Sequence, residues 1–297
     1  MEAFAYRAPT GLAEAIAILA DAARTGQRAQ VMAGGTDLLV QLRVVDRSPR
    51  TIVDIKRIPE TTALVIGARE VIIGAAIKSA ELVGNKQLAA LYPGLIESLD
   101  LIGSTQIQGR ASLGGNLCNA SPAGDTIPAL IACGAVCQIR GPNGSREMAV
   151  EDFVTGVQKN ALAKDELLVA LKLVRPAANS SDAYLRFIPR SEMDIAVVGV
   201  GVSLTLDGNG VCTAARVGIG AVAPRALLVP AAGAALIGTK VDAAALTAAG
   251  KACTAASSPI SDKRGTAAYR RTIVAVLCRR AGQIALDRAV RARGAAA

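Results

Sequence analysis

Two pairs of adjacent glycines, 80 residues apart, constrain the fold of this 297-residue chain more than any other feature. The first pair, Gly34-Gly35, follows an apolar segment at 29–33 that predicts a strand, and it precedes Thr36. Because glycine has no Cβ atom, the backbone N–H groups of such a turn can approach an anion closely, and the Thr36 hydroxyl adds another donor. The pattern therefore suits a pyrophosphate group, although an ordinary tight turn would give the same residues.

The second pair, Gly114-Gly115, lies in the segment 103–124, which is rich in glycine, serine and asparagine and is predicted to be one long irregular loop. Loops of that length inside a compact domain usually have a function. The loop ends at Asp125, which is predicted to cap the helix that follows. Neither pair belongs to a G-x-G-x-x-G or P-loop sequence, so neither of those nucleotide-binding folds is predicted. Two loops that suit anions indicate a chain that holds a large phosphorylated cofactor.

The chain contains no histidine and no tryptophan, and only 2% of its residues are aromatic. Without imidazole it cannot use a Ser–His or Cys–His pair or a histidine metal ligand, which excludes most serine and cysteine hydrolases and most zinc enzymes. The shortage of aromatic rings argues against base stacking, so no nucleic acid partner is expected. With 52% hydrophobic and 19% charged residues, the chain is expected to form a packed globular structure.

The six cysteines form no C-x-x-C pair and no cluster, so the sequence predicts neither a metal site nor an iron–sulfur site in this chain. Cys133 and Cys137 lie four residues apart in an apolar run, which predicts two buried thiols along one helix face. The N-terminal segment lacks the basic start of a signal peptide, and the stretches without charge are too short to cross a bilayer. We therefore expect a cytoplasmic protein without a membrane span.

Hydrophobic periodicity predicts an α+β fold in two parts, with a boundary near 175–182. The first part, 1–176, is expected to divide into subdomains at about 1–60 and 61–176. The first subdomain is predicted to contain strands at 4–7, 29–33 and 51–54, a helix at 12–24 and a helix or turn at 37–44. The second is predicted to contain a hairpin at 64–66 and 71–73, single helices at 85–102 and 126–133, and strands at 135–140, 147–150 and 167–173.

The smaller second part, 177–297, is predicted to begin with a linker at 177–182 and to contain a three-stranded antiparallel sheet and a helical cluster. Its predicted strands are 184–188, 195–206 and 213–219, and its predicted helices are 225–236, 242–256 and 265–293. From Lys263 to Arg293 the chain carries nine basic residues against one acid, Asp287. Such a segment is either a solvated helix face or a docking surface for an acidic partner or for phosphates.

Several of these segments resemble the FAD-binding (medium) subunit of the molybdenum hydroxylases, the family of xanthine dehydrogenase and carbon monoxide dehydrogenase. The resemblance rests on Ala33-Gly34-Gly35-Thr36-Asp37-Leu38, Ser112-Leu113-Gly114-Gly115-Asn116, Ala120-Ser121-Pro122 with Asp125, and Arg190-x-x-Met193-Asp194-Ile195-Ala196. It covers nearly the whole chain, and the two glycine pairs together are far more specific than either pair alone. It implies an FAD-binding domain of the two-subdomain flavoprotein type over 1–176, followed by a C-terminal domain of sheet and helices over 177–297.

The resemblance also implies how the cofactor is held. The two glycine segments would converge on the pyrophosphate of one FAD, and Ser121 and Asp125 would bind its ribityl or ribose hydroxyls. Ile102 and Leu168 would pack against the flavin or the adenine, and Arg186 would reach the cofactor; core positions for the first two and a solvated position for Arg186 are the alternatives. The residues assigned to FAD in this way are Met32, Ala33, Gly34, Gly35, Thr36, Asp37, Leu38, Ile102, Ser112, Gly114, Gly115, Asn116, Ser121, Asp125, Leu168 and Arg186. No catalytic side chain and no metal ligand is implied in this chain.

The implied function is that of an oxidoreductase subunit that transfers electrons. FAD would take electrons from 2Fe–2S clusters on a small partner chain and pass them to an external acceptor such as NAD, a quinone or dioxygen, while a large partner chain would hold molybdopterin. The cysteine-rich insertion of the hydroxybenzoyl-CoA reductases is missing, which disfavours that reaction. Two alternatives stay open at this point: a self-sufficient flavin oxidase or dehydrogenase of a related fold, and an assembly scaffold without a cofactor.

Overall fold

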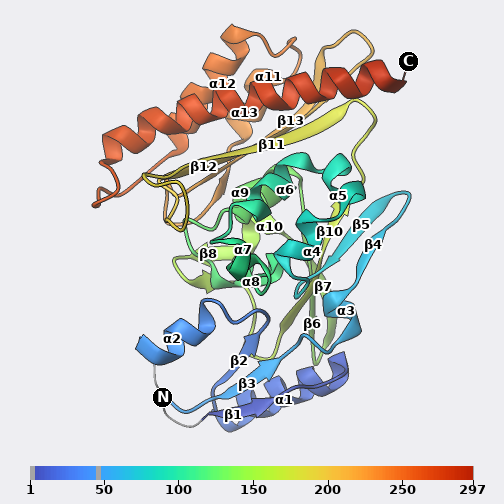
Figure 1. The fold of residues 1–297 in the computed structure, drawn as a ribbon, viewed down its shortest axis with the longest axis vertical. Coiled ribbons are helices and arrows are strands. Elements are labelled where there is room, and N and C mark those ends of the chain that lie inside the picture. The colour runs from blue at the N-terminus through green and yellow to red at the C-terminus, as the bar shows by residue number, and fades with distance from the viewer. Residues whose placement is uncertain (1–3, 45–47, 297) are drawn as a thin grey trace.

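A computed structural model describes residues 4–44 and 48–296 of the chain. Its N-terminal part is a small parallel sheet covered by one helix, at the bottom of Figure 1. The strands lie in the order β1-β3-β2. The elements are β1 (Ala5–Arg7), α1 (Leu12–Thr25), β2 (Ala29–Met32), α2 (Leu38–Val44) and β3 (Thr51–Asp54). Ala15 and Leu19 of α1 pack with Val53, so one apolar helix face closes this small core.

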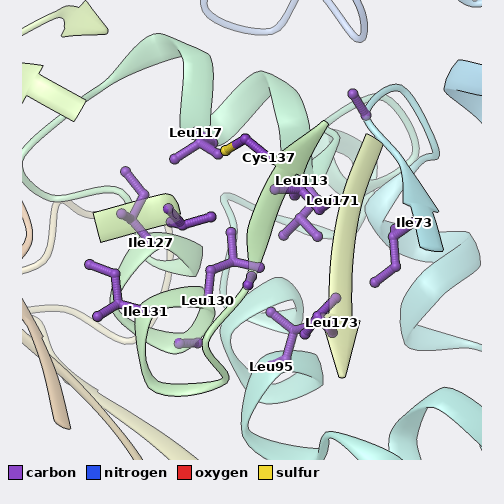
Figure 2. Packing of buried hydrophobic residues seen from close by; sticks show 14 of the residues in the cluster. Ile73, Leu95, Leu113, Leu117, Ile127, Leu130, Ile131, Cys137, Leu171 and Leu173 are labelled. Carbon is purple, nitrogen blue, oxygen red and sulfur yellow. The ribbon is translucent and has the colours of Figure 1, made fainter. Parts of the chain in front are cut away.

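The central part is built on a five-stranded antiparallel sheet in the order β4-β5-β10-β6-β7. Its strands are β4 (Leu64–Ile66), β5 (Glu70–Gly74), β6 (Val136–Gly141), β7 (Gly144–Ala149) and β10 (Leu167–Val174), with α3 (Pro59–Thr62) leading into it. The short elements α10 (Val150–Phe153), β8 (Val154–Gly156) and β9 (Lys159–Asn160) follow β7. Figure 2 shows Leu171 of β10 gathered with Leu113, Leu117 and Leu130 from the neighbouring helices, so one apolar core joins sheet and helices.

The single helix predicted over 85–102 is wrong, because the structure has two helices there. After α4 (Ser79–Val83), α5 spans Lys86–Leu91 and α6 spans Pro93–Asp100. The break falls at Tyr92, whose backbone has φ −136° and ψ 66°. Proline disfavours the helical conformation in the residue before it and lacks an N–H to donate, so a new helix starts at Pro93.

The long irregular loop predicted over 103–124 is also wrong. It contains α7 (Thr105–Gln108) and α8 (Leu113–Asn119), and α9 (Thr126–Ala132) follows. Leu113 and Leu117 of α8 are fully buried, so the second glycine pair lies in the first turn of a helix whose apolar face packs into the core. Cys133 follows α9 and Cys137 lies in β6, which corrects the prediction that both thiols share one helix face.

The C-terminal part is a four-stranded antiparallel sheet in the order β11-β12-β13-β14, not the three-stranded sheet predicted. The added strand, β14, is only two residues long. The strands are β11 (Ser180–Phe187), β12 (Val198–Leu206), β13 (Cys212–Gly220) and β14 (Leu227–Leu228), and the helices are α11 (Pro230–Leu236), α12 (Ala243–Ala256) and α13 (Ala267–Ala296). In Figure 1 the long helix α13 crosses this sheet at the top of the molecule. The end of the predicted linker, from Ser180, already belongs to β11.

The other face of this sheet lies directly against helices of the central part. A Cβ atom at Gly201 or Gly218 would lie 2.7 Å or 2.3 Å from the Pro128 carbonyl oxygen, so these glycines allow α9 to approach the strands. The carboxylate of Asp182 accepts a hydrogen bond of 2.9 Å from the Leu95 N–H in the first turn of α6. The two parts therefore share a tight interface.

Candidate functional site

A cleft of about 490 Å³ separates the N-terminal sheet from the central part, within the range of small-molecule and cofactor sites. Both glycine pairs line it, as the sequence analysis predicted. One wall comes from β2 and the turn that leads into α2, and the opposite wall comes from the start of α8 and the segment before β10. Of the residues assigned to FAD from the sequence, the cleft is lined by Met32, Ala33, Gly34, Gly35, Thr36, Asp37, Leu38, Ile102, Ser112, Gly114, Gly115, Asn116 and Leu168.

The first glycine segment leaves β2 in a turn that its sequence makes possible. Gly35 has φ +76°, a left-handed conformation that glycine adopts without the steric cost of a side chain. Its carbonyl accepts a hydrogen bond of 3.0 Å from the Leu39 N–H, which starts α2. Within residues 4–44 and 48–296, the backbone N–H groups of Gly34, Gly35, Thr36 and Asp37 donate to no protein acceptor. Consecutive N–H groups without partners beside a cleft form a site that favours an anion.

The second glycine segment is held in place by hydrogen bonds to Ser112 and to the backbone of Ala75. Ser112 caps α8, and its Oγ accepts a hydrogen bond of 3.1 Å from the Gly115 N–H. Gly114 donates its N–H to the Ala75 carbonyl at 3.1 Å, and a Cβ atom on Gly114 would lie only 2.6 Å from that oxygen. The start of α8 is therefore held against the strand-to-helix connection of the central part, and Gly114 is required for that close approach.

The two glycine segments touch each other. A Cβ atom on Gly34 would lie 1.8 Å from the carbonyl oxygen of Arg110, two residues before Ser112. A Cβ atom on Gly115 would lie 4.0 Å from the Cβ of Ala33. Backbone from both sides of the cleft thus meets at one place, and no side chain at Gly34 could be accommodated without moving the chain.

The rest of the predicted site contains both polar and apolar side chains. Asn116 accepts a hydrogen bond of 2.7 Å from the Thr126 hydroxyl, which fixes its amide near the start of α9. Burial raises the pKa of Asp37, so this carboxyl group is less acidic than a solvated one. Leu168 is almost fully buried on β10, and Ile102 is half-buried, so both give the cleft an apolar surface. These contacts suit a ligand with both a charged and an apolar part.

The structure does not bring Ser121, Asp125 and Arg186 to the lining of this cleft. Asp125 instead accepts hydrogen bonds from Arg186 at 2.8 Å and from the Tyr184 hydroxyl at 3.0 Å, and both side chains come from β11. Burial raises the pKa of Asp125, and the Arg186 guanidinium and the Tyr184 hydroxyl oppose that rise. Asp125 occupies the N-cap position of α9, as predicted, but its side chain makes no cap hydrogen bond. Ser121 accepts from the Ala123 N–H at 3.3 Å within its own turn.

Part of the cleft wall consists of residues that were not predicted from the sequence. Gln41 of α2 donates a hydrogen bond of 3.1 Å to Asn119 of α8, which joins the two sides of the cleft. The segment before β10 also lines the cleft, and Asn160 there donates to the Cys118 carbonyl at 2.9 Å. Only the run of polar residues between the predicted strands at 147–150 and 167–173 could have indicated this wall. The additional lining residues of this segment are Gln158, Asn160, Leu162, Ala163, Lys164 and Glu166.

Neither metal ligands nor a membrane helix is found in the described part of the chain. No group of three or more cysteine or acidic side chains among these residues could hold a metal ion. Among the same residues, no helix is both long enough and apolar enough to cross a bilayer.

The parallel subdomain, the antiparallel subdomain and the cleft between them define a flavoprotein of the two-subdomain class. Residues 2–175 match the family described as the FAD binding domain in molybdopterin dehydrogenase, and residues 183–285 match the CO dehydrogenase flavoprotein C-terminal domain. The chain therefore belongs to the family of FAD-binding subunits of the molybdopterin dehydrogenases.

Relatives of known function match over nearly the whole chain. The carbon monoxide dehydrogenase medium chain of Afipia carboxidovorans is 34% identical over 287 residues, which are 96% of this chain and 98% of that one. The medium chain of the same enzyme from Hydrogenophaga pseudoflava is 30% identical and covers 94% of this chain and 95% of its own length. The reconstituted CO dehydrogenase from Oligotropha carboxidovorans contains a chain that matches with a TM-score of 0.91 at 32% identity, covering 97% of this chain and 99% of that one.

Proposed function

We propose that this chain is the flavoprotein subunit of a molybdenum-dependent hydroxylase or dehydrogenase complex and that its cleft binds FAD. One observation carries the proposal: consecutive backbone N–H groups of Gly34 to Asp37 have no partner within the described residues and lie beside the second glycine segment in one cleft. A pyrophosphate between the two segments would accept the hydrogen bonds that the protein leaves unmade.

The proposed roles follow the chemistry of each wall. The segment Met32–Leu38 and the segment Ser112–Asn116 hold the pyrophosphate, and Ile102 and Leu168 pack against an aromatic ring of the cofactor. Ser121, Asp125 and Arg186 are proposed as further contacts, with Asp125 and Arg186 acting as one ion pair. All three lie outside the cleft lining.

The chemistry belongs to the cofactor and the positioning belongs to the chain. Bound FAD supplies the exchange of electrons in steps of one and two between iron–sulfur clusters and an external acceptor. This chain's residues bind the diphosphate, orient the dinucleotide along the cleft and exclude water from its apolar wall. None of them needs to donate or remove a proton as a catalytic acid or base, in keeping with a sequence that has no histidine.

The proposed complex contains two further chains, a large molybdopterin-binding subunit and a small iron–sulfur subunit. The names of the relatives support this, since two are medium chains and another is the nicotinate dehydrogenase FAD-subunit of Eubacterium barkeri. We assign residues 1–176 to the FAD-binding domain and 177–297 to the C-terminal domain, close to the limits of the two family matches. A cytoplasmic location is proposed because all six cysteines are free thiols.

The absorbance spectrum of the purified chain tests this proposal. Expressed together with its proposed partners, the chain should co-purify with both and carry one bound flavin. Expressed alone, the apoprotein should bind added FAD. A chain that retains no flavin after gentle purification and takes up none on titration would contradict the proposed function.

A further inference from the structure

Three side chains connect the strands of the parallel sheet at its carboxyl edge, the edge at which ligands bind in open sheets of this kind. Asp54 ends the central strand β3, and its carboxylate accepts a hydrogen bond of 2.6 Å from the Tyr6 hydroxyl of β1. The Lys56 ammonium donates to the same carboxylate at 2.7 Å and to the carbonyl oxygen of Ala33, directly after β2, at 2.8 Å. Tyr6, Asp54 and Lys56 thus form a hydrogen-bond network that ends at the first glycine segment.

The ion pair between Lys56 and Asp54 in this network is held in place by burial and by further hydrogen bonds. Asp54 is buried, with 8% of its side chain exposed, and Lys56 is partly buried with 27% exposed. Burial alone would raise the pKa of Asp54, but the hydrogen bonds from Lys56 and Tyr6 outweigh that effect and hold the pKa below its usual value. Asp54 therefore stays charged at neutral pH. A further hydrogen bond of 3.0 Å from the Lys56 N–H to the same carboxylate holds the backbone of Lys56 in place.

The contact with Ala33 sets the direction of the next N–H group. The carbonyl of Ala33 and the N–H of Gly34 belong to one planar trans peptide, so they point in opposite directions. The preceding carbonyl, that of Met32, is already tied to the Ile55 N–H at 3.1 Å. With Ala33 held by Lys56, and with Gly34 packed against the Arg110 carbonyl, that peptide has little freedom to rotate.

We propose that Lys56 is a positioning residue for the cofactor: it holds the Ala33 carbonyl so that the Gly34 N–H is aimed at the diphosphate. Lys56 itself does not line the cleft, whereas Ala33 and Gly34 do. The inference rests on the proposed function, because it concerns the same cleft. Loss of the lysine leaves the cleft and its apolar wall intact but frees the peptide that leads into the glycine turn.

The test is the dissociation constant for FAD of the full-length apoprotein, measured for K56M, K56R and K172M. Lys172 is the matched control, because its side chain is 25% exposed and it forms an ion pair with Glu147, but it does not line the cleft or contact the glycine segments. K56M should bind FAD about tenfold more weakly, K56R should recover affinity to within about threefold of the unsubstituted chain, and K172M should bind normally. The recovery by arginine, which can donate to both Asp54 and Ala33, separates positioning from general packing.

K56M leaves Asp54 buried without its cation, so a double variant, K56M/D54N, removes both charges and should show the same loss of FAD affinity if K56M does not fold. Melting temperatures of the apoproteins accompany every titration. The inference is overturned if K56M or the double variant binds FAD within about twofold of the unsubstituted chain, or if K172M loses as much affinity. An unsubstituted chain that binds no FAD at all would instead refute the proposed function, on which the inference depends.

Discussion

Replacing Gly35 with alanine tests the first glycine segment, and Gly26 provides a matched control. Both glycines have left-handed backbones, with φ +76° at Gly35 and +72° at Gly26. A Cβ atom at Gly35 would lie 3.3 Å from the Met32 sulfur and 3.5 Å from Leu39 side-chain carbons, which are flexible enough to shift, and at Gly26 it would meet no atom within 4 Å. Backbone strain, about 1–2 kcal/mol for an L side chain in this conformation, is therefore the main cost in both variants.

The strain should lower the folding stability of G26A, whereas in G35A it should weaken the binding of FAD. Gly26 ends α1, and its N–H donates to the Ala23 carbonyl, so G26A should lower the free energy of unfolding by about 1–2 kcal/mol with or without FAD. In the apoprotein of G35A the peptides that follow residue 35 can relax, because the amides of Thr36 and Asp37 have no partners to lose among the described residues. The left-handed turn at Gly35 is the conformation that places residues 34–37 along the cleft, so the dissociation constant for FAD should rise about 5- to 30-fold.

Fluorescence titration of FAD into each apoprotein gives the dissociation constants, and urea denaturation gives the free energies of unfolding. G26A should bind FAD within about twofold of the unsubstituted chain. The reasoning is refuted if G35A binds FAD as tightly as the unsubstituted chain does, or if G26A loses as much affinity as G35A.

Three further predictions concern stability. G114A should lower the free energy of unfolding by about 1–3 kcal/mol in urea denaturation, because its Cβ would lie 2.6 Å from the backbone oxygen of Ala75; no loss would contradict the close approach. R186M leaves the buried carboxylate of Asp125 without its cation and should cost about 3–5 kcal/mol in the same assay, whereas a loss under about 1 kcal/mol would show that the pair is unimportant. Burial raises the pKa of Asp182 to about 6, so its folded form retains a proton that the unfolded chain releases; this stabilising contribution is complete below the unfolded pKa and is lost as the pH rises through about 6. D182N should therefore gain stability relative to the unsubstituted chain between about pH 4 and pH 7, and a constant difference over that range would contradict the assignment.

The sequence allowed the site to be predicted better than the local structure around it. Apolar runs predicted the strand before Gly34, which is β2, and the strand β10. The two glycine pairs were predicted to lie close together, and the cleft that both pairs line confirms this. The helices α7 and α8 were missed because they span only 4 and 7 residues, and helices this short depend on tertiary packing such as the burial of Leu113.

Contacts between residues far apart in the chain could not be predicted from the sequence either. Asp125 and Arg186 were each expected to bind the cofactor, but they lie 61 residues apart and form an ion pair with each other. No periodicity in either segment indicates that pairing, because it arises from the way β11 packs against the start of α9. Lys56 is similar: its segment is unremarkable in sequence, and its contact with Ala33 exists only because β2 and β3 are neighbours in the sheet.

The structure of this chain with FAD bound is the decisive measurement for the proposed cofactor site. The two phosphates should lie between the glycine segments, within hydrogen-bonding distance of the N–H groups of Gly34 to Asp37 and beside Gly115. A dinucleotide bound elsewhere on the chain, or one in this cleft with its phosphates turned away from both segments, would contradict it.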